Sequence, residues 1–336
     1  MREAEFYEKL DKGRVKCHLC SHHCLINEGK RGICGVRENR QSVLYSLVYG
    51  KVVGFNVDPI EKKPLFHFYP GSDSLSISTV GCNFKCLHCQ NADISQYPHL
   101  YGGKIEGRDM TPEDVVSAAQ RTGAQSISYT YTEPTIFMEF ARDCAVLAHE
   151  KGIKNVFVSN GYTTKEAAEA IIPYLDANNI DLKGGDDFYK KLCSARLQPV
   201  LDTIALMHES GVWIEITTLV IPGWNDSDST LQTIAEFIVS LDRSIPWHVT
   251  QFYPTYKLTD KPRTPLSTLK KAYDIGKAAG LKYVYLGNVP GENGESTFCP
   301  DCGDILIARR GYSIGVKKIK NGRCAACNAA IEGVGM

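Results

Sequence analysis

Long hydrophobic segments are missing from this chain of 336 residues. No apolar run reaches the roughly 18 residues that a membrane-spanning helix needs, and the first residues, MREAEFYEKL, lack the apolar core of a secretory signal. A net charge is missing as well, because Lys plus Arg and Asp plus Glu both number 38. No global field therefore attracts nucleic acid or anionic lipid. We expect a cytoplasmic protein with no membrane partner, and we do not expect nucleic acid as its partner.

Low-complexity segments and internal repeats are absent beyond a recurring β/α rhythm. Hydrophobic residues at 43% and charged residues at 23% are typical of a globular protein. The length allows one large core with small appendages. We expect a Cys-rich N-terminal metal-binding extension (1–72), a central barrel (73–290) and a C-terminal four-cysteine metal-binding ribbon (291–336).

Cysteine is abundant and clustered. Thirteen cysteines are more than neutral packing needs, and in a reducing compartment clustered cysteines bind metals more often than they form disulfides. Only Cys144 and Cys193 stand alone, and for these two we expect buried, unreactive side chains. The remaining eleven fall into three groups: Cys17, Cys20, Cys24 and Cys34; Cys82, Cys86 and Cys89; and Cys299, Cys302, Cys324 and Cys327.

From about residue 75, short runs rich in β-branched residues alternate with amphipathic stretches of helical period. The segment TPEDVVSAAQRTG illustrates the helical stretches, with a Thr cap, an early Pro, acids in the first turn and a closing Gly123. Alternation of this kind predicts a parallel sheet covered by helices: a partial (β/α)6, TIM-like barrel with its chemistry at the strand C-terminal ends. The expected strands are 75–81, 125–131, 154–160, 178–183, 212–221, 247–252 and 281–288. The expected helices are 111–123, 134–151, 163–173, 197–210, 228–241 and 265–280.

The segment GCNFKCLHCQN follows the first expected strand and spaces Cys82, Cys86 and Cys89 as C-x3-C-x2-C. Three thiolate ligands leave one iron of a [4Fe-4S] cluster open, as catalytic zinc sites keep an open position. A zinc knuckle that takes its fourth ligand from elsewhere is the alternative. The spacing resembles the defining motif of the radical S-adenosylmethionine (radical SAM) superfamily, although His88 replaces the aromatic residue usual beside the last cysteine.

The resemblance implies an oxygen-sensitive oxidoreductase that works anaerobically. In that family the reduced cluster cleaves S-adenosylmethionine to a 5′-deoxyadenosyl radical, which abstracts hydrogen from a substrate. A reductant such as flavodoxin or ferredoxin is then an expected partner.

The same resemblance assigns cosubstrate contacts at the ends of the later strands. Glu133 takes the place of the acidic residue that meets the methionine amino group, with a first-turn helix acid as the alternative. Ser159 and Asn160 look like the polar residues near the methionine carboxylate and ribose, with turn chemistry as the alternative. Asp181 and Lys183 resemble the D-L-K segment of glycyl-radical activating enzymes, and two opposite charges in an apolar strand are costly unless both are used.

The fifth strand, WIEITTLVIPGWND, looks like that subfamily's fifth strand and directs Glu215 and Thr217 into the pocket by alternation. In QFYPTYKL the histidine expected to contact the ribose is missing, and Tyr253 and Tyr256 stand there instead.

Residues 75 to 290 resemble the activating enzymes of pyruvate formate-lyase. The segments HLCSHHC, DPIEKKPLFHFYPGS, GCNFKCLHCQN, SYTYTEPT and YLGNVPG are similar, more narrowly, to the radical enzymes of the AmmeMemoRadiSam system. In DPIEKKP, Lys62 and Lys63 fit either a solvated turn or contact with an anionic group.

Two C-x2-C knuckles, at Cys299 and Cys302 and at Cys324 and Cys327, have the spacing of a zinc ribbon or a rubredoxin-like site. Structural zinc is our prediction, with iron or an electron-carrying cluster as the alternative. The N-terminal set of Cys17, Cys20, Cys24 and Cys34 has less standard spacing. Zinc and an auxiliary iron–sulfur cluster both fit it, and free thiols are the remaining interpretation.

The leading functional hypothesis is hydrogen abstraction from a substrate, by a glycyl-radical or other protein-modifying activase. An RNA-modifying enzyme, or an RNA-binding module using the basic segment GYSIGVKKIKNGR of the ribbon, is the alternative.

Overall fold

The computed structural model describes residues 1–289 and 293–336. Its centre is an eight-stranded sheet in the strand order β16-β15-β14-β13-β12-β11-β9-β8. All neighbours from β9 to β16 pair in parallel. These strands are β9 (Asp73–Ser78), β11 (Ser126–Tyr129), β12 (Lys154–Ser159), β13 (Ala177–Asp181), β14 (Trp213–Val220), β15 (Trp247–Gln251) and β16 (Val284–Gly287). Each expected strand is confirmed, because apolar residues buried on both faces of a parallel sheet leave a clear signal.

Helices fill the connections between successive parallel strands, as the β/α rhythm predicted. The long ones are α3 (Pro112–Thr122), α4 (Met138–Glu150), α5 (Lys165–Ile171), α7 (Gln198–Glu209), α8 (Asp228–Leu241) and α9 (Leu266–Ala279). The shorter segments are α1 (Ala92–Ser95), α2 (Tyr97–Leu100), α6 (Asp186–Phe188), η1 (Asp11–Gly13), η2 (Ile60–Lys62), η3 (Pro134–Phe137), η4 (Ile172–Tyr174), η5 (Tyr189–Cys193) and η6 (Asn293–Glu295).

Helix α3 shows how local sequence sets an element's ends. The Thr111 hydroxyl accepts from the amide of Asp114 at 3.2 Å, and the Asp114 carboxylate accepts from the amide of Thr111 at 2.9 Å. This capping box satisfies two otherwise unpaired donors of the first turn. Gly123 ends the helix at φ 69°, a left-handed conformation that glycine adopts without strain.

The N-terminal segment forms small antiparallel sheets and then joins the main sheet. Strand β8 (Gly54–Pro59) pairs antiparallel with β9, so a part of the expected extension is an edge strand of the barrel sheet. The other strands of this region are β1 (Arg2–Glu3), β2 (Tyr7–Lys9), β3 (Val15–Cys17), β4 (Leu25–Ile26), β5 (Arg37–Arg40), β6 (Val43–Ser46), β7 (Lys51–Val52) and its partner β10 (Arg108–Asp109).

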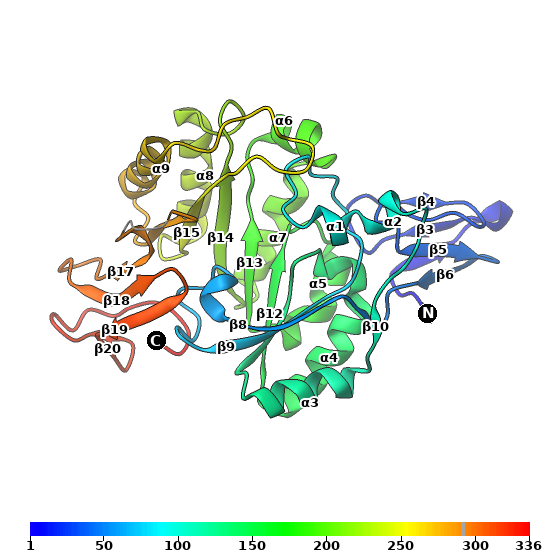
Figure 1. Cartoon of the computed structure of the whole chain (residues 1–336), viewed down its shortest axis with the longest axis horizontal. Helices are drawn as coiled ribbons and strands as arrows, with labels where there is room; N and C mark the ends of the chain where they lie inside the picture. The colour runs from blue at the N-terminus through cyan, green and yellow to red at the C-terminus, as the bar shows by residue number, and fades with distance from the viewer. Residues whose placement is uncertain (290–292) are drawn as a thin grey trace.

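The C-terminal segment is a small ribbon at the other end of the molecule. Figure 1 shows it and the N-terminal sheets at opposite ends of the long axis, with the parallel strands between them. Its strands are β17 (Thr297–Phe298), β18 (Ile305–Arg310), β19 (Ser313–Lys317), β20 (Ile319–Lys320) and β21 (Arg323–Cys324). Leu306, Ile307 and Ile331 form a common core with Phe66 and Tyr285, so the ribbon packs against the barrel.

The expected boundary at residues 290 and 291, and the end of the segment YLGNVPG, lie outside the described residues. None of the described helices is long and apolar enough to span a bilayer.

Candidate active site

The loop that leaves β9 carries Cys82, Cys86 and Cys89 at the carboxyl end of the parallel sheet. Backbone hydrogen bonds join this loop to η5, from the amide of Lys85 to the carbonyl of Cys193 at 3.0 Å and from Leu87 to Leu192 at 2.9 Å. The thiol of Cys89 lies 3.2 Å from the Ser95 hydroxyl. The three thiols are therefore held on a braced loop at the edge where a parallel barrel performs its chemistry.

This loop carries buried polar atoms that have no hydrogen-bond partner among the described residues. They are both ring nitrogens of His88 and the Nζ of Lys85. Burial lowers the pKa of His88 to about 3 and that of Lys85 to about 8. Unpartnered buried donors beside several thiols fit an additional group with acceptor atoms, such as the sulfurs of an iron–sulfur cluster.

Cys193 is a residue that sequence reasoning missed. Its Sγ, a ligand nitrogen of His88 and the Sγ of Cys86 all lie within 4.8 Å of one another. The neighbouring Cys193 thiol lowers the pKa of Cys86 despite burial. An isolated cysteine more than 100 residues from the motif carries no sequence signal, because only the fold of η5 returns it to the loop.

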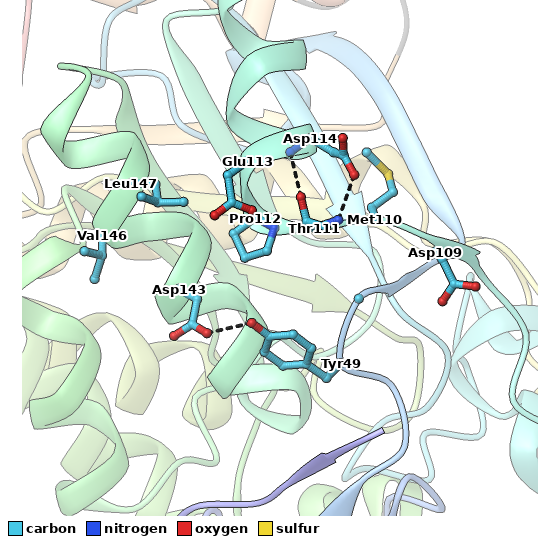
Figure 2. A pocket seen from close by; sticks show the side chains of 11 residues that line it. Tyr49, Asp109, Met110, Thr111, Pro112, Glu113, Asp114, Asp143, Val146 and Leu147 are labelled. Carbon is cyan, nitrogen blue, oxygen red and sulfur yellow. Dashed lines mark hydrogen bonds between the residues drawn. The ribbon is translucent and has the colours of Figure 1, made fainter.

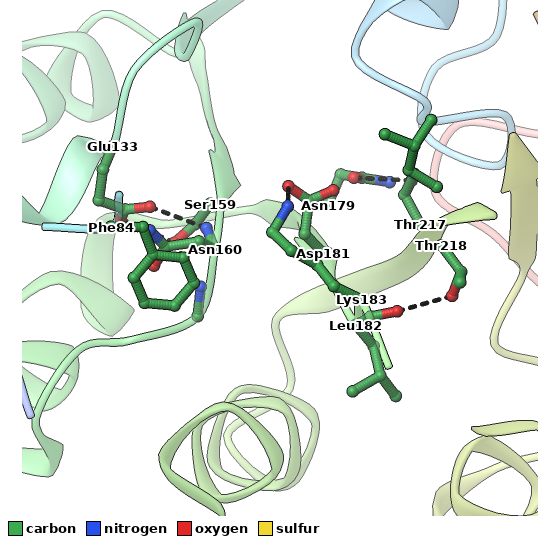
Figure 3. Close-up of polar contacts among 12 residues, drawn as sticks. Phe84, Glu133, Ser159, Asn160, Asn179, Asp181, Leu182, Lys183, Thr217 and Thr218 are labelled. Atoms are coloured by element: carbon green, nitrogen blue, oxygen red, sulfur yellow. Dashed lines mark hydrogen bonds and ion pairs between the residues drawn. The ribbon is translucent and has the colours of Figure 1, made fainter. Parts of the chain in front are cut away.

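Three predicted cosubstrate residues lie together beside the cysteine loop: Glu133, Ser159 and Asn160 (Figure 3). One Glu133 oxygen accepts from the Ser159 hydroxyl at 2.9 Å, and the other accepts from the Asn160 amide at 2.8 Å. The Asn160 side chain lies 3.9 Å from Cys82 Sγ and donates to the Asn83 side chain at 2.8 Å. Glu133 is 1% exposed, and this burial raises the pKa of its carboxyl group. A cation bound beside the carboxylate would oppose that effect and favour the charged form.

The alternatives for these residues also have structural support. Glu133 caps η3 by accepting from the Thr135 amide at 3.0 Å. Ser159 accepts from the Gly161 amide and Asn160 from the Tyr162 amide, each at 3.0 Å, which is turn chemistry. The cosubstrate roles of Glu133, Ser159 and Asn160 stay predictions.

Asp181 and Lys183 form a second polar group at the end of β13, separate from the first in Figure 3. Their side chains pair at 2.6 Å. Burial disfavours the ammonium of Lys183, but Asp181, Cys86 and Cys193 outweigh it and raise the lysine pKa. Thr217 lies opposite Asp181 in the register of β13 and β14 and donates to Asn179 at 3.0 Å.

Glu215 lies near the beginning of β14, away from the strand end where the other polar residues gather. Its carboxylate accepts from the backbone amides of Phe66 at 3.0 Å and His67 at 2.8 Å. It also accepts from Trp213 Nε1 at 3.1 Å and contacts His248 Nε2 at 2.7 Å. The structure therefore does not bring Glu215 together with Glu133, and four protein partners occupy its oxygens.

The two lysines of DPIEKKP face an anionic group of the chain itself. Lys62 and Lys63 each lie 2.7 Å from an Asp58 oxygen. Burial lowers the pKa of Lys63 to about 8, against the attraction of Asp58. Tyr253, at the position where a histidine was missing, donates to Gln251 at 2.8 Å.

The four ribbon cysteines converge. The Sγ atoms of Cys299, Cys302, Cys324 and Cys327 all lie within 4.8 Å of one another. Four thiols at this separation are a donor set that tetrahedral zinc or iron fits. A small cavity elsewhere is lined by the N-terminal cysteines, Cys17, Cys20, Cys24 and Cys34.

A larger hollow lies elsewhere on the molecule. A cavity of about 720 Å³ is lined by residues of α3, α4 and the segment around Tyr49. Figure 2 shows its acidic rim, including Asp143, which accepts from the Tyr49 hydroxyl at 2.7 Å. None of its lining residues belongs to the polar groups described above. Size alone therefore does not identify the chemical site in this fold.

Comparisons with known proteins agree with this geometry. The radical SAM superfamily profile matches residues 76–237. The chain is 50% identical to the protein named "Uncharacterized protein MJ0808" of Methanocaldococcus jannaschii, over 99% of both chains. It is 27% identical to the "Putative glycyl-radical enzyme activating enzyme MJ1227" of the same organism, over 64% of this chain and 88% of that one. It is 25% identical to the pyruvate formate-lyase 1-activating enzyme of Escherichia coli K12, over 47% of this chain and 65% of that one.

Solved structures support the fold. The Streptococcus suis protein SuiB bound to S-adenosylmethionine aligns with a TM-score of 0.51 at 14% identity, over 72% of this chain and 56% of that one. A radical SAM methyltransferase from Sphaerobacter thermophilus aligns with a TM-score of 0.50 at 16% identity, over 65% of this chain and 67% of that one. The cysteine loop at the carboxyl end of the parallel sheet, the matching profile and these relatives lead to one conclusion: the chain is an enzyme of the radical SAM superfamily.

Proposed function

We propose that this enzyme abstracts a hydrogen atom from a protein substrate, as an activase of the glycyl-radical type. The relatives named as activating enzymes support this proposal, since two of them align with about half or more of the chain. The observation that carries it is the placement of Cys82, Cys86 and Cys89 on one braced loop beside Glu133 and Lys183.

In this proposal Cys82, Cys86 and Cys89 hold a [4Fe-4S] cluster by three of its irons. With S-adenosylmethionine bound, such a cluster would supply the electron for reductive cleavage of a carbon–sulfur bond, the chemistry that gives the 5′-deoxyadenosyl radical. A small reductant of the flavodoxin or ferredoxin class delivers that electron.

The residues of the chain would bind and orient the cosubstrate. Glu133 keeps its carboxylate fixed by three donors, so a methionine ammonium that approaches it meets a preorganised acceptor. Asn160 connects that acceptor to Cys82 and would position the amino-acid end of the cosubstrate against the loop. Lys183, held by Asp181, would face an anionic group near Cys86.

The test is anaerobic reconstitution of the wild type and of the Cys82→Ala/Cys86→Ala/Cys89→Ala variant. We expect the variant to lose about four irons per chain. We also expect it to lose all dithionite-driven formation of 5′-deoxyadenosine and methionine. Cys144→Ala, a change in a cysteine buried within α4, is the matched control and should retain both. Product formation by the triple variant would overturn the proposal.

The protein substrate needs a second measurement. With deuterated candidate proteins, deuterium transfer into 5′-deoxyadenosine identifies the protein from which hydrogen is taken. Deuterium transfer from a small molecule, with none from protein, would support radical chemistry and reject the activase proposal.

A further inference from the structure

The N-terminal cysteines line one cavity although they are spread over three segments of the chain. Cys17 ends β3, Cys20 and Cys24 lie in the turn that returns to β4, and Cys34 precedes β5. All four line the same small cavity. Gly32 lies beside Cys24, since a Cβ on Gly32 would be in van der Waals contact with Cys24 Sγ at 3.6 Å. The folding of this segment therefore places four potential metal ligands around one space.

A buried guanidinium indicates that the cavity holds a group with hydrogen-bond acceptors. Arg37 also lines the cavity and is 1% exposed. Its Nη2 donates to the Glu5 carbonyl at 3.0 Å and pairs with Glu139. Its Nε and Nη1 have no partner among the described residues. Buried charged donors without acceptors destabilise a fold, so these two donors favour an acceptor on the cavity side.

We propose that Cys17, Cys20, Cys24 and Cys34 bind a metal centre as four thiolates, and that Arg37 donates hydrogen bonds to its sulfurs. Zinc(II) with four thiolates has a net charge of 2 − 4 = −2, and a [4Fe-4S] core of charge +2 with four thiolates has the same. Either centre is a buried dianion with sulfur acceptors, which is the chemistry that the free donors of Arg37 match.

The centre would also brace the catalytic loop. Gly81, at φ 99°, packs so closely that a Cβ there would lie 2.5 Å from Val36 Cγ1 and 3.0 Å from the Cys34 carbonyl. On the other side of Cys82, His22 Nε2 donates to the Asn83 carbonyl at 2.8 Å. The residues before and after Cys82 thus rest on the segment that the metal would fix.

The first test is metal analysis of the Cys20→Ala/Cys24→Ala variant purified without oxygen, with Cys144→Ala as the control. We expect the double variant to lose about one zinc or about four irons per chain, and the control to lose none. Loss of zinc alone assigns a zinc site, and loss of iron with sulfide assigns a cluster. Unchanged zinc, iron and sulfide in a folded double variant would overturn the proposal.

A second measurement uses the wild type, because the variant could fail to fold. Cys20 and Cys24 are partly exposed, so a small alkylating reagent reaches them when they are free. We expect peptide mass spectrometry to show alkylation at least ~10-fold slower before metal removal than after it, because bound thiolates are shielded. Equal rates in both states would contradict a metal at this site.

The bracing role has its own readout. Amide hydrogen exchange in residues 81–89 should become faster in the Cys20→Ala/Cys24→Ala variant, while exchange in α9 stays unchanged. Unchanged exchange throughout the loop, with the metal lost, would limit the site to folding the N-terminal sheets.

Discussion

At the scale of single residues, two buried glutamates differ in role: one is proposed to bind the cosubstrate, and the other holds the protein backbone. Glu133 lies beside the cysteine loop, whereas Glu215 holds the backbone of Phe66 and His67 near the beginning of β14. Both carboxylates are buried, so burial does not distinguish them. Their neighbours do, because only Glu133 is connected to Cys82 through Asn160.

The Glu133→Gln change should weaken S-adenosylmethionine binding by about 10- to 100-fold, the equivalent of a charged hydrogen bond. Glutamine keeps the size of the side chain and removes the charge that an ammonium would meet. Equilibrium dialysis against the reconstituted enzyme measures the affinity.

Glu215→Gln is the matched control, and we expect it to lower the free energy of unfolding while leaving the cosubstrate affinity within about twofold. A large affinity loss in Glu215→Gln, with none in Glu133→Gln, would return the cosubstrate role to Glu215 as the sequence pattern suggested.

Cys193 gives a second prediction at this scale. Its thiol lies within 4.8 Å of the Cys86 sulfur and favours negative charge there, so Cys193→Ala should make the cluster harder to reduce by a few tens of millivolts. Potentiometric titration followed by electron paramagnetic resonance measures the change. Cys144→Ala should not alter the potential, and an identical shift in both variants would show that Cys193 has no special role.

At the scale of elements, the sequence predicted the barrel units well and the appended units less completely. Every parallel strand from β9 to β16 was expected, because its apolar run and the amphipathic helix after it are local signals. The edge strand β8 was not, since GFNVDP has two exposed residues in its middle and gains its place only by pairing with β9. Tertiary pairing, which no local window contains, decided that element.

The same limit applies to the site. Cys82, Cys86 and Cys89 could be identified because their spacing is itself the signal. Cys193 could not, since its position depends on η5 folding back onto the loop. Arg37 was likewise hidden, because a buried unpaired guanidinium is visible only in three dimensions.

The ribbon yields a prediction about metal dependence. Cys302 and Cys327 are exposed, so replacing both by alanine removes two of the predicted ligands with little loss of packing. We expect the variant to lose about one zinc per chain and to become sensitive to proteolysis within 297–336, because metal supplies much of the folding free energy of such small units. Metal analysis and limited proteolysis test this, and unchanged metal with unchanged resistance would contradict it.

At the scale of the whole molecule, His67 joins the barrel to the ribbon. Its Nδ1 donates to the Glu332 carbonyl at 2.7 Å, which leaves Nε2 to accept from the Tyr285 hydroxyl at 2.6 Å. Burial lowers the pKa of His67 to about 4, against the opposing attraction of Glu215. The neutral ring is therefore the form that the folded protein requires.

This lowered pKa predicts a pH dependence of stability. Between about pH 6.5, the ordinary histidine pKa, and about pH 4, the unfolded chain binds more protons than the folded one. The free energy of unfolding should thus fall as the pH falls through this window, by up to about 3 kcal/mol. Urea unfolding at several pH values measures the slope.

His67→Asn is the control, because its amide keeps a donor near the Nδ1 position and does not titrate. We expect a less stable protein with a flatter dependence between pH 6.5 and 4. Equal slopes in the two proteins would assign the effect to other groups.

The contacts of His67 also bear on the order in which the chain folds during synthesis. Val334 donates to the His67 carbonyl at 2.8 Å and accepts from the Tyr69 amide at 2.7 Å, and these partners are separated by more than 260 residues. A chain still attached to the ribosome has made residues 67–69 long before residues 332–334 emerge. The barrel strands can pair in order as they appear, but the backbone of residues 67–69 lacks these partners until residues 332–334 have been made. A nascent chain would therefore present the backbone around His67 to chaperones without these hydrogen-bond partners.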